Sequence, residues 1–116
     1  MGAWSAAALL LLAGACRSEP PSLAVESTAA PEDVVVLRVP GSWELTGAAA
    51  RAIDTGRFDA IVALGCLIKG DTIHFDLIAA ETAKGLAGLE RERGVPVAFG
   101  VLTTDTLEQA IDRAGA

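Results

Sequence analysis

The sequence predicts an α/β fold, in which a parallel sheet is covered by helices on both faces, and three observations support this prediction. Apolar, β-branched segments typical of strands occur at residues 34–40, 58–68 and 96–102. Segments with the apolar spacing of helices alternate with these strands, as they do in βαβ units. The strands are apolar along their whole length, so helices are needed on both faces of the sheet.

The composition indicates one small packed domain without a basic surface. Of the 116 residues, 52% are hydrophobic and 21% are charged, and the net charge is −6. A nucleic-acid partner is not expected, because nothing in the chain builds the basic stripe that binds phosphates. The two cysteines, Cys16 and Cys66, lie far apart in apolar surroundings, so neither a metal site nor a disulfide framework is expected.

Residues 1–33 form an atypical N-terminal segment, separate from the regular α/β domain expected at residues 34–116. Residues 1–16 are small and apolar and could be an export signal with Cys16 in a lipoprotein-like box, yet no basic residue precedes Arg17. The alternative is a core-facing helix, the remnant of a first helix. The stretch is short for a membrane span, which needs about 20 apolar residues, so no membrane partner is expected. Prolines in residues 17–33 indicate a loop.

The first helix of the regular region is expected between Ser42 and Gly56. The strand before it stops at Pro40 and Gly41, which interrupt a hydrogen-bonded ladder. Ser42 then has the side chain of an N-cap, and Gly56 suits the left-handed conformation that commonly ends a helix. A helix after the first strand is the connection that a parallel sheet requires.

The second helix is expected over residues 72–93 and is closed by Gly94. A last short helix follows the strand at residues 96–102. It is expected to begin at Asp105, because Asp105 and Glu108 have the spacing of a capping box. Strands and helices therefore alternate to the end of the chain, and their crossovers are expected to be right-handed.

Polar residues gather where the three strands end, at residues 41–44, 70–74 and 103–105. In a parallel sheet these ends lie on one edge, which is where such sheets bind ligands. His74 is the only histidine, and histidine is the side chain that transfers protons near neutral pH. Residues 70–72 form a turn that opens a helix and could hold a phosphate. The sequence therefore predicts a ligand site at this edge.

Each of these residues also has a simpler interpretation. Trp43 could stack on a planar ring or could pack in the core. His74 could be a solvated residue at the start of a helix. The turn at residues 70–72 is too short for a P-loop, and the charge of Asp71 opposes a bound anion. Their gathering at one edge supports a ligand site but does not identify a reaction.

Three stretches resemble the lumazine synthase family, and the resemblance extends from residue 34 to residue 115. They are RVPGSWEL (residues 38–45), ALGCLIKGDTIHFD (residues 63–76) and PVAFGVLTTDTLEQAIDRAG (residues 96–115). The resemblance implies a flavodoxin-like three-layer sandwich and a cytoplasmic transferase of riboflavin biosynthesis. This enzyme condenses 5-amino-6-ribitylamino-pyrimidinedione with 3,4-dihydroxy-2-butanone 4-phosphate and releases phosphate. It implies no metal and no organic cofactor.

The resemblance also implies partners and roles for single residues. The family forms homo-oligomeric pentamers, which in many members assemble into icosahedral shells, and riboflavin synthase is a further expected partner. His74 matches the proton-transfer residue, and Arg113 matches an arginine that a neighbouring subunit lends to the phosphate. Phe99 matches an aromatic ring from that neighbour. The remaining substrate-binding residues implied by the resemblance are Ser42, Trp43, Glu44, Leu67, Ile68, Gly70, Asp71 and Thr72.

Two features of the family pattern have no clear counterpart in this sequence. The family begins with an inner strand that ends in an aromatic residue, and residues 1–33 offer no convincing equivalent. The family's final segment and last helix are also not found after residue 115. The domain at residues 34–116 is therefore interpreted as truncated at both ends. The alternative is a non-catalytic or decayed relative that forms shells or binds ligands.

Overall fold

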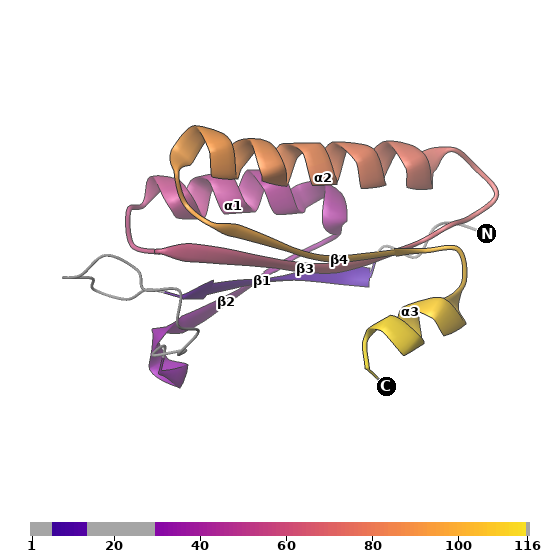
Figure 1. The fold of residues 1–116 in the computed structure, drawn as a ribbon, viewed down its shortest axis with the longest axis horizontal. Coiled ribbons are helices and arrows are strands. Elements are labelled where there is room, and N and C mark those ends of the chain that lie inside the picture. The colour runs from indigo at the N-terminus through magenta and orange to yellow at the C-terminus, as the bar shows by residue number, and fades with distance from the viewer. Residues whose placement is uncertain (1–5, 14–29, 116) are drawn as a thin grey trace.

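The computed structural model describes residues 30–115 and the backbone of residues 6–13. Four strands and three α-helices form the domain, and two short 3-10 helices, η1 and η2, precede β2 and α1 (Figure 1). In chain order the elements are β1 (Ala6–Ala13), η1 (Pro31–Asp33), β2 (Val34–Val39), η2 (Ser42–Glu44), α1 (Leu45–Asp54), β3 (Ala60–Ile68), α2 (His74–Arg93), β4 (Val97–Thr104) and α3 (Leu107–Arg113). The expected alternation of strands and helices is confirmed from β2 onward.

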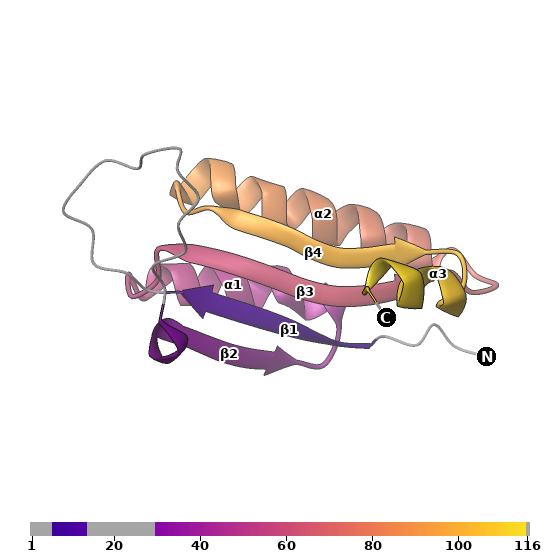
Figure 2. The same cartoon turned by 60° about the horizontal axis from the view of Figure 1, so that its bottom comes forward.

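The sheet has the strand order β2-β1-β3-β4. Strands β3 and β4 are parallel, and their register runs without a break from Ile61 opposite Val97 to Ile68 opposite Thr104. Strand β1 is antiparallel to both β2 and β3, so its arrow points against those of β2 and β4 (Figure 2). The three strands expected from the sequence therefore all point the same way, but the antiparallel β1 between β2 and β3 makes the sheet mixed and not wholly parallel.

The inner position of the sheet, for which the sequence offered no convincing strand, is held by β1. Residues 6–13 are thus a strand and not the helix that was one interpretation of the N-terminal segment. A short apolar run has no periodicity that separates a strand from a buried helix. Without β1, the facing edges of β2 and β3 would be unpaired. A strand between them satisfies backbone groups on both sides, and this favours a strand over a helix.

Helices cover both faces of the sheet, which gives the expected three layers. Helices α1 and α2 lie side by side on one face, and the short α3 lies on the other (Figures 1 and 2). The main core forms between the sheet and the α1–α2 layer. Its buried residues are Leu45, Ala49, Ala52, Ile53, Ile61, Ala63, Leu67, Leu86, Leu89, Val97 and Val101.

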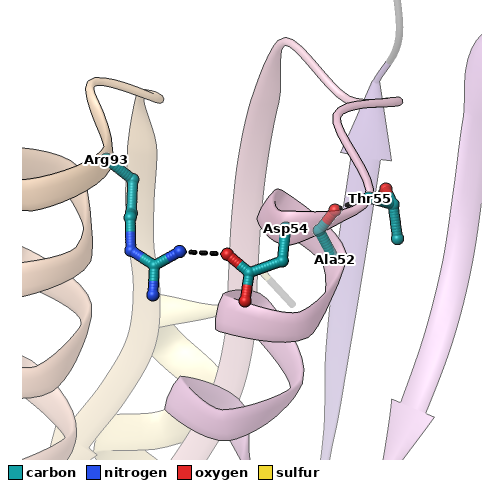
Figure 3. Close-up of polar contacts among 4 residues, drawn as sticks. All are labelled: Ala52, Asp54, Thr55 and Arg93. Atoms are coloured by element: carbon teal, nitrogen blue, oxygen red, sulfur yellow. Dashed lines mark hydrogen bonds and ion pairs between the residues drawn. The ribbon is translucent and has the colours of Figure 1, made fainter.

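The ends of α1 and α2 are fixed by local contacts near the start of β3. Arg93 of α2 forms an ion pair with Asp54 of α1 (Figure 3). The Thr55 hydroxyl donates to the carbonyl oxygen of Ala52 at 2.6 Å in the last turn of α1. Gly56 and Gly94 then adopt the left-handed conformation, with φ of 68° and 67°. The two glycines predicted to stop these helices are confirmed.

Both predicted helix starts that relied on capping residues are wrong by a small shift. Ser42 does not cap α1, because residues 42–44 form η2 and the Ser42 side chain turns into the protein. At α3 the capping box joins Thr106 and Gln109 and not Asp105 and Glu108. The Thr106 hydroxyl accepts from the Gln109 N–H at 3.2 Å, and Gln109 Oε1 accepts from the Thr106 N–H at 3.4 Å. Strand β4 continues to Thr104, which moves the cap onward.

Candidate functional site

The carboxyl ends of β3 and β4 lie next to each other, as the sequence predicts. The Lys69 N–H donates to the Thr104 carbonyl oxygen at 2.9 Å, which extends the ladder past the last residue of β3. The chain then turns through residues 70–73 and enters α2 at His74. The Thr72 hydroxyl accepts from the His74 N–H at 3.4 Å. The turn and the start of α2 are thus held at the edge of the sheet.

The start of α2 has a mixed electrostatic character. The first N–H groups of a helix have no partner within the helix and carry a partial positive charge, which favours an anion. Asp71 and Asp76 place two carboxylates in the same region, and both are exposed. Lys69 is exposed at the end of β3 and carries the opposite charge. An anion bound here therefore needs a further cation beside the helix.

A cavity of about 620 Å³ lies between η2, α1 and α2, and we call it the helix groove. Trp43 and Glu44 contribute to it from η2, and Trp43 is 59% exposed. Arg51 and Glu81 place one charge of each sign on its walls. Its complete lining is Val39, Trp43, Glu44, Thr46, Gly47, Ala48, Arg51, Glu81, Thr82 and Gly85.

A second cavity of about 340 Å³ lies where β4 ends and α3 begins, and we call it the strand-end cleft. Arg113, at the end of α3, reaches this cleft beside Thr103 and Thr104. The complete lining is Val101, Leu102, Thr103, Thr104, Gln109, Asp112 and Arg113. Within the described part of the chain, the two cavities share no lining residue.

The structure places the remaining candidate residues at different depths. Phe99 is on β4 and is 47% exposed, so its ring is open to a partner. Leu67 is 2% exposed and belongs to the core, and Ile68 is half-buried, which leaves the backbone as the main surface of this pair. Ser42 is fully buried, and its Oγ has no hydrogen-bond partner among the described residues.

Seven of the candidate residues therefore form three groups. Gly70, Asp71 and Thr72 lie in the turn that leads into His74 at the start of α2, Trp43 and Glu44 share the helix groove, and Arg113 lies apart in the strand-end cleft. The sequence analysis missed the wall of the helix groove that Thr82 and Gly85 form. Two small residues three positions apart in the helix expected at residues 72–93 are the signal that could have indicated a closely packed helix face.

The described residues contain neither a cluster suited to a metal ion nor a helix suited to a membrane. No group of three or more histidine, cysteine, aspartate or glutamate side chains in residues 30–115 is arranged to hold a metal ion. No helix in the same part of the chain has the length and apolar character that a membrane crossing needs.

Comparison with known proteins places these residues in a family. The sequence model for 6,7-dimethyl-8-ribityllumazine synthase matches residues 11–116, which include all of the candidate residues. Curated proteins of that name match as well. The protein from Chlorobium phaeovibrioides is 54% identical over 84 residues, and that from a Synechococcus species is 57% identical over 77 residues. The protein from Chlorobium luteolum is 51% identical over 84 residues.

These matches cover most of this chain but only part of each relative. The two Chlorobium matches span 72% of this chain and 54% of the relative, and the Synechococcus match spans 66% and 48%. The chain thus spans about half the length of the curated relatives it matches. Because the family model matches nearly all of it, the chain belongs to the 6,7-dimethyl-8-ribityllumazine synthase family.

Proposed function

We propose that this chain forms 6,7-dimethyl-8-ribityllumazine from 5-amino-6-ribitylamino-pyrimidinedione and 3,4-dihydroxy-2-butanone 4-phosphate, with release of phosphate and water. One observation carries the proposal: in a chain of this family, the turn at residues 70–74 lies at the carboxyl edge of the sheet, and Trp43 and Glu44 lie in the groove beside it. Such an edge is where parallel α/β sheets hold ligands. The reaction joins two substrates, so much of the rate would come from holding them together.

The phosphate of the four-carbon substrate would bind at the turn before α2. Residues 70–72 and the unpaired N–H groups of α2 supply donors there. Asp71 and Asp76 oppose the phosphate charge, so Arg113 would supply the compensating guanidinium. Arginine suits this role because its planar donors match phosphate oxygens. Arg113 lies in a separate cavity in this chain, which supports its contribution from a neighbouring copy.

His74 would move protons during condensation and phosphate loss. Its backbone N–H is held by Thr72, while its side chain is exposed at the first residue of α2. Trp43 and Glu44 would hold the pyrimidine and its ribityl chain in the helix groove. Phe99 would cover the ring from the neighbouring copy, since it is exposed on β4. His74 is thus the residue on which we expect the chemistry itself to depend.

The same reasoning gives the proposed partners and location. A site that takes Phe99 and Arg113 from a neighbour requires a homo-oligomer, which we propose to be a pentamer that can assemble into a larger shell. Riboflavin synthase, which consumes the product, is a proposed further partner. The substrates are small cytoplasmic metabolites in this scheme, so we place the protein in the cytoplasm.

Substitution of His74 tests the proposed function. We expect His74→Ala to lower turnover by about 10²–10⁴, the usual contribution of a positioned proton-transfer group, with little change in substrate binding. Product formation is followed by the absorbance and fluorescence of the lumazine. Lys84→Ala is the matched control, because Lys84 is exposed on the same helix and lines neither cavity. No product from the unchanged chain, or equal turnover in His74→Ala, would contradict the proposal.

A further inference from the structure

The Thr82 side chain makes a hydrogen bond that its position inside a helix does not explain. It lies inside α2 and is 2% exposed, and its hydroxyl donates to the Ser42 carbonyl oxygen at 3.3 Å, forty positions away in the sequence. A threonine hydroxyl inside a helix usually returns to a carbonyl of the preceding turn. Threonine is also a poor helix former. The hydroxyl therefore serves a contact between two elements and not the helix itself.

The element that receives this bond is η2, the short turn that carries Trp43 and Glu44. Its own hydrogen bonds are few: the Glu44 N–H donates to Gly41 at 3.2 Å, and the Leu45 N–H donates to Ser42. The Ser42 Oγ, fully buried, adds no hydrogen bond among the described residues. The Thr82 hydroxyl thus connects this turn directly to a long, well-formed helix.

Gly85 brings the same face of α2 close to the start of α1. A Cβ at Gly85 would lie 2.6 Å from the Thr46 Oγ1, which is too close for any real contact. The absent side chain lets α1 and α2 approach at this level, next to the bond from Thr82. Thr82 and Gly85 both line the helix groove together with Trp43 and Glu44. One face of α2 therefore sets both the depth of the groove and the position of the turn above it.

We propose that Thr82 is a positioning residue: its hydroxyl holds η2 against α2 and so sets where Trp43 and Glu44 stand in the helix groove. The inference rests on the proposed function, because it assigns the groove to the pyrimidine substrate. Thr82 is buried beneath η2 and acts through the Ser42 carbonyl. His74 lies on the first turn of the same helix, α2. The bond thus couples the ring-binding turn to the helix that carries the proton-transfer residue.

The separate roles proposed for Thr82 and His74 predict a specific kinetic effect. Loss of the hydroxyl should loosen Trp43 and Glu44 but leave His74 in place. Binding is then weakened equally in the ground state and the transition state, which raises KM and leaves kcat nearly unchanged. We expect KM for the pyrimidine to rise about three- to tenfold, the factor that one ordinary hydrogen bond gives. If Thr82 had only a structural role, its loss would lower stability without raising KM at a nearly unchanged kcat.

The experiment compares Thr82→Ala with Thr82→Ser in the full chain. Both variants remove the methyl group, and only the alanine removes the hydroxyl. Thr55→Ala is the matched control, because Thr55 also donates to a backbone carbonyl but lies at the far end of α1. We expect Thr82→Ala alone to raise KM, and Thr82→Ser and Thr55→Ala to stay near the unchanged chain. Equal KM values for Thr82→Ala and Thr82→Ser would overturn the inference.

A second measurement does not depend on turnover. The sequence has two tryptophans, Trp4 and Trp43, so a Trp4→Phe background isolates Trp43. The fluorescence anisotropy of Trp43 should fall in Thr82→Ala and return to its original value in Thr82→Ser. If the unchanged chain makes no lumazine, the proposed function fails, while the anisotropy still decides whether Thr82 holds η2 in place. Unchanged anisotropy in Thr82→Ala would overturn the inference even in an active protein.

Discussion

The helix groove and the strand-end cleft are built by different means. The groove depends on contacts between distant parts of the chain: Thr82 with Ser42, and Gly85 with Thr46. The strand-end cleft depends on bonds within residues 104–109, where the Thr104 hydroxyl donates to Thr106 at 3.0 Å beside the Thr106 capping box. The groove is therefore a product of tertiary packing, whereas the cleft is a product of local structure.

This difference predicts how substitutions beside each cavity should affect the stability of the protein. A substitution that disrupts packing beside the groove affects two helices and the core between them, so its effect on stability should be large. A lost cap beside the cleft affects only the short α3 and the end of β4, so its effect should be smaller. Substitutions at Gly85, beside the groove, and at Thr106, beside the cleft, test this difference.

Gly85→Ala should cause the larger loss of stability. The new methyl group meets Thr46 at 2.6 Å, and overpacking of this kind outweighs the gain in helix propensity. We expect the free energy of unfolding to fall by about 1–2 kcal/mol, measured by urea denaturation followed by circular dichroism.

Gly88→Ala is the matched control on the same helix. A Cβ at Gly88 would meet only Glu92 Oε1, at 3.9 Å, so the methyl group has room. Alanine is favoured over glycine inside a helix, and we expect a gain of about 0.5–1 kcal/mol. A gain in both variants would show that α1 and α2 are not closely packed at Thr46.

The sequence predicted the part of the fold that local patterns determine. Strands β2, β3 and β4 and the glycines that end α1 and α2 were all located from composition and spacing. Strand β1 was not, because an apolar run is compatible with helix or strand and only its two neighbours in the sheet select the strand. The same holds for Ser42, which has the side chain of a cap but is fully buried, with its carbonyl oxygen bonded to Thr82.

Thr106→Ala should have a smaller effect, because it removes only the cap of α3. The hydroxyl that accepts from the Gln109 N–H is lost, and we expect the free energy of unfolding to fall by about 1 kcal/mol. Asp105→Ala is the comparison, since the sequence alone favoured Asp105 as the cap. Denaturation curves of both variants give the answer. A larger loss in Asp105→Ala would restore the cap that the sequence suggested.

The sequence indicated the parts of the candidate site but not their arrangement, and the roles of these residues stay predictions. The turn before α2 and the pair Trp43 and Glu44 were proposed because strand ends in a parallel sheet share one edge. The sequence could not show that Arg113 lies in a cavity apart from Trp43, since this depends on where α3 packs. Nor could it show Thr82 beneath η2, because a hydrogen bond between residues forty positions apart leaves no local pattern.

We propose that one chain does not complete a site, and the separation of the helix groove from the strand-end cleft that carries Arg113 supports this. Mixing two impaired variants tests it. An oligomer of His74→Ala and Arg113→Ala chains contains interfaces where one chain supplies His74 and its neighbour supplies Arg113. The control mixture joins His74→Ala with Glu44→Ala, whose lost residues belong to the same side of the proposed site.

The measurement is lumazine formation after subunit exchange, which is confirmed by native mass spectrometry of the mixed oligomers. We expect activity in the His74→Ala and Arg113→Ala mixture to rise above that of either variant alone, and activity in the control mixture to stay at the level of its two variants measured separately. Exchanged oligomers of His74→Ala and Arg113→Ala that form no product would contradict a site shared between the two cavities of neighbouring chains.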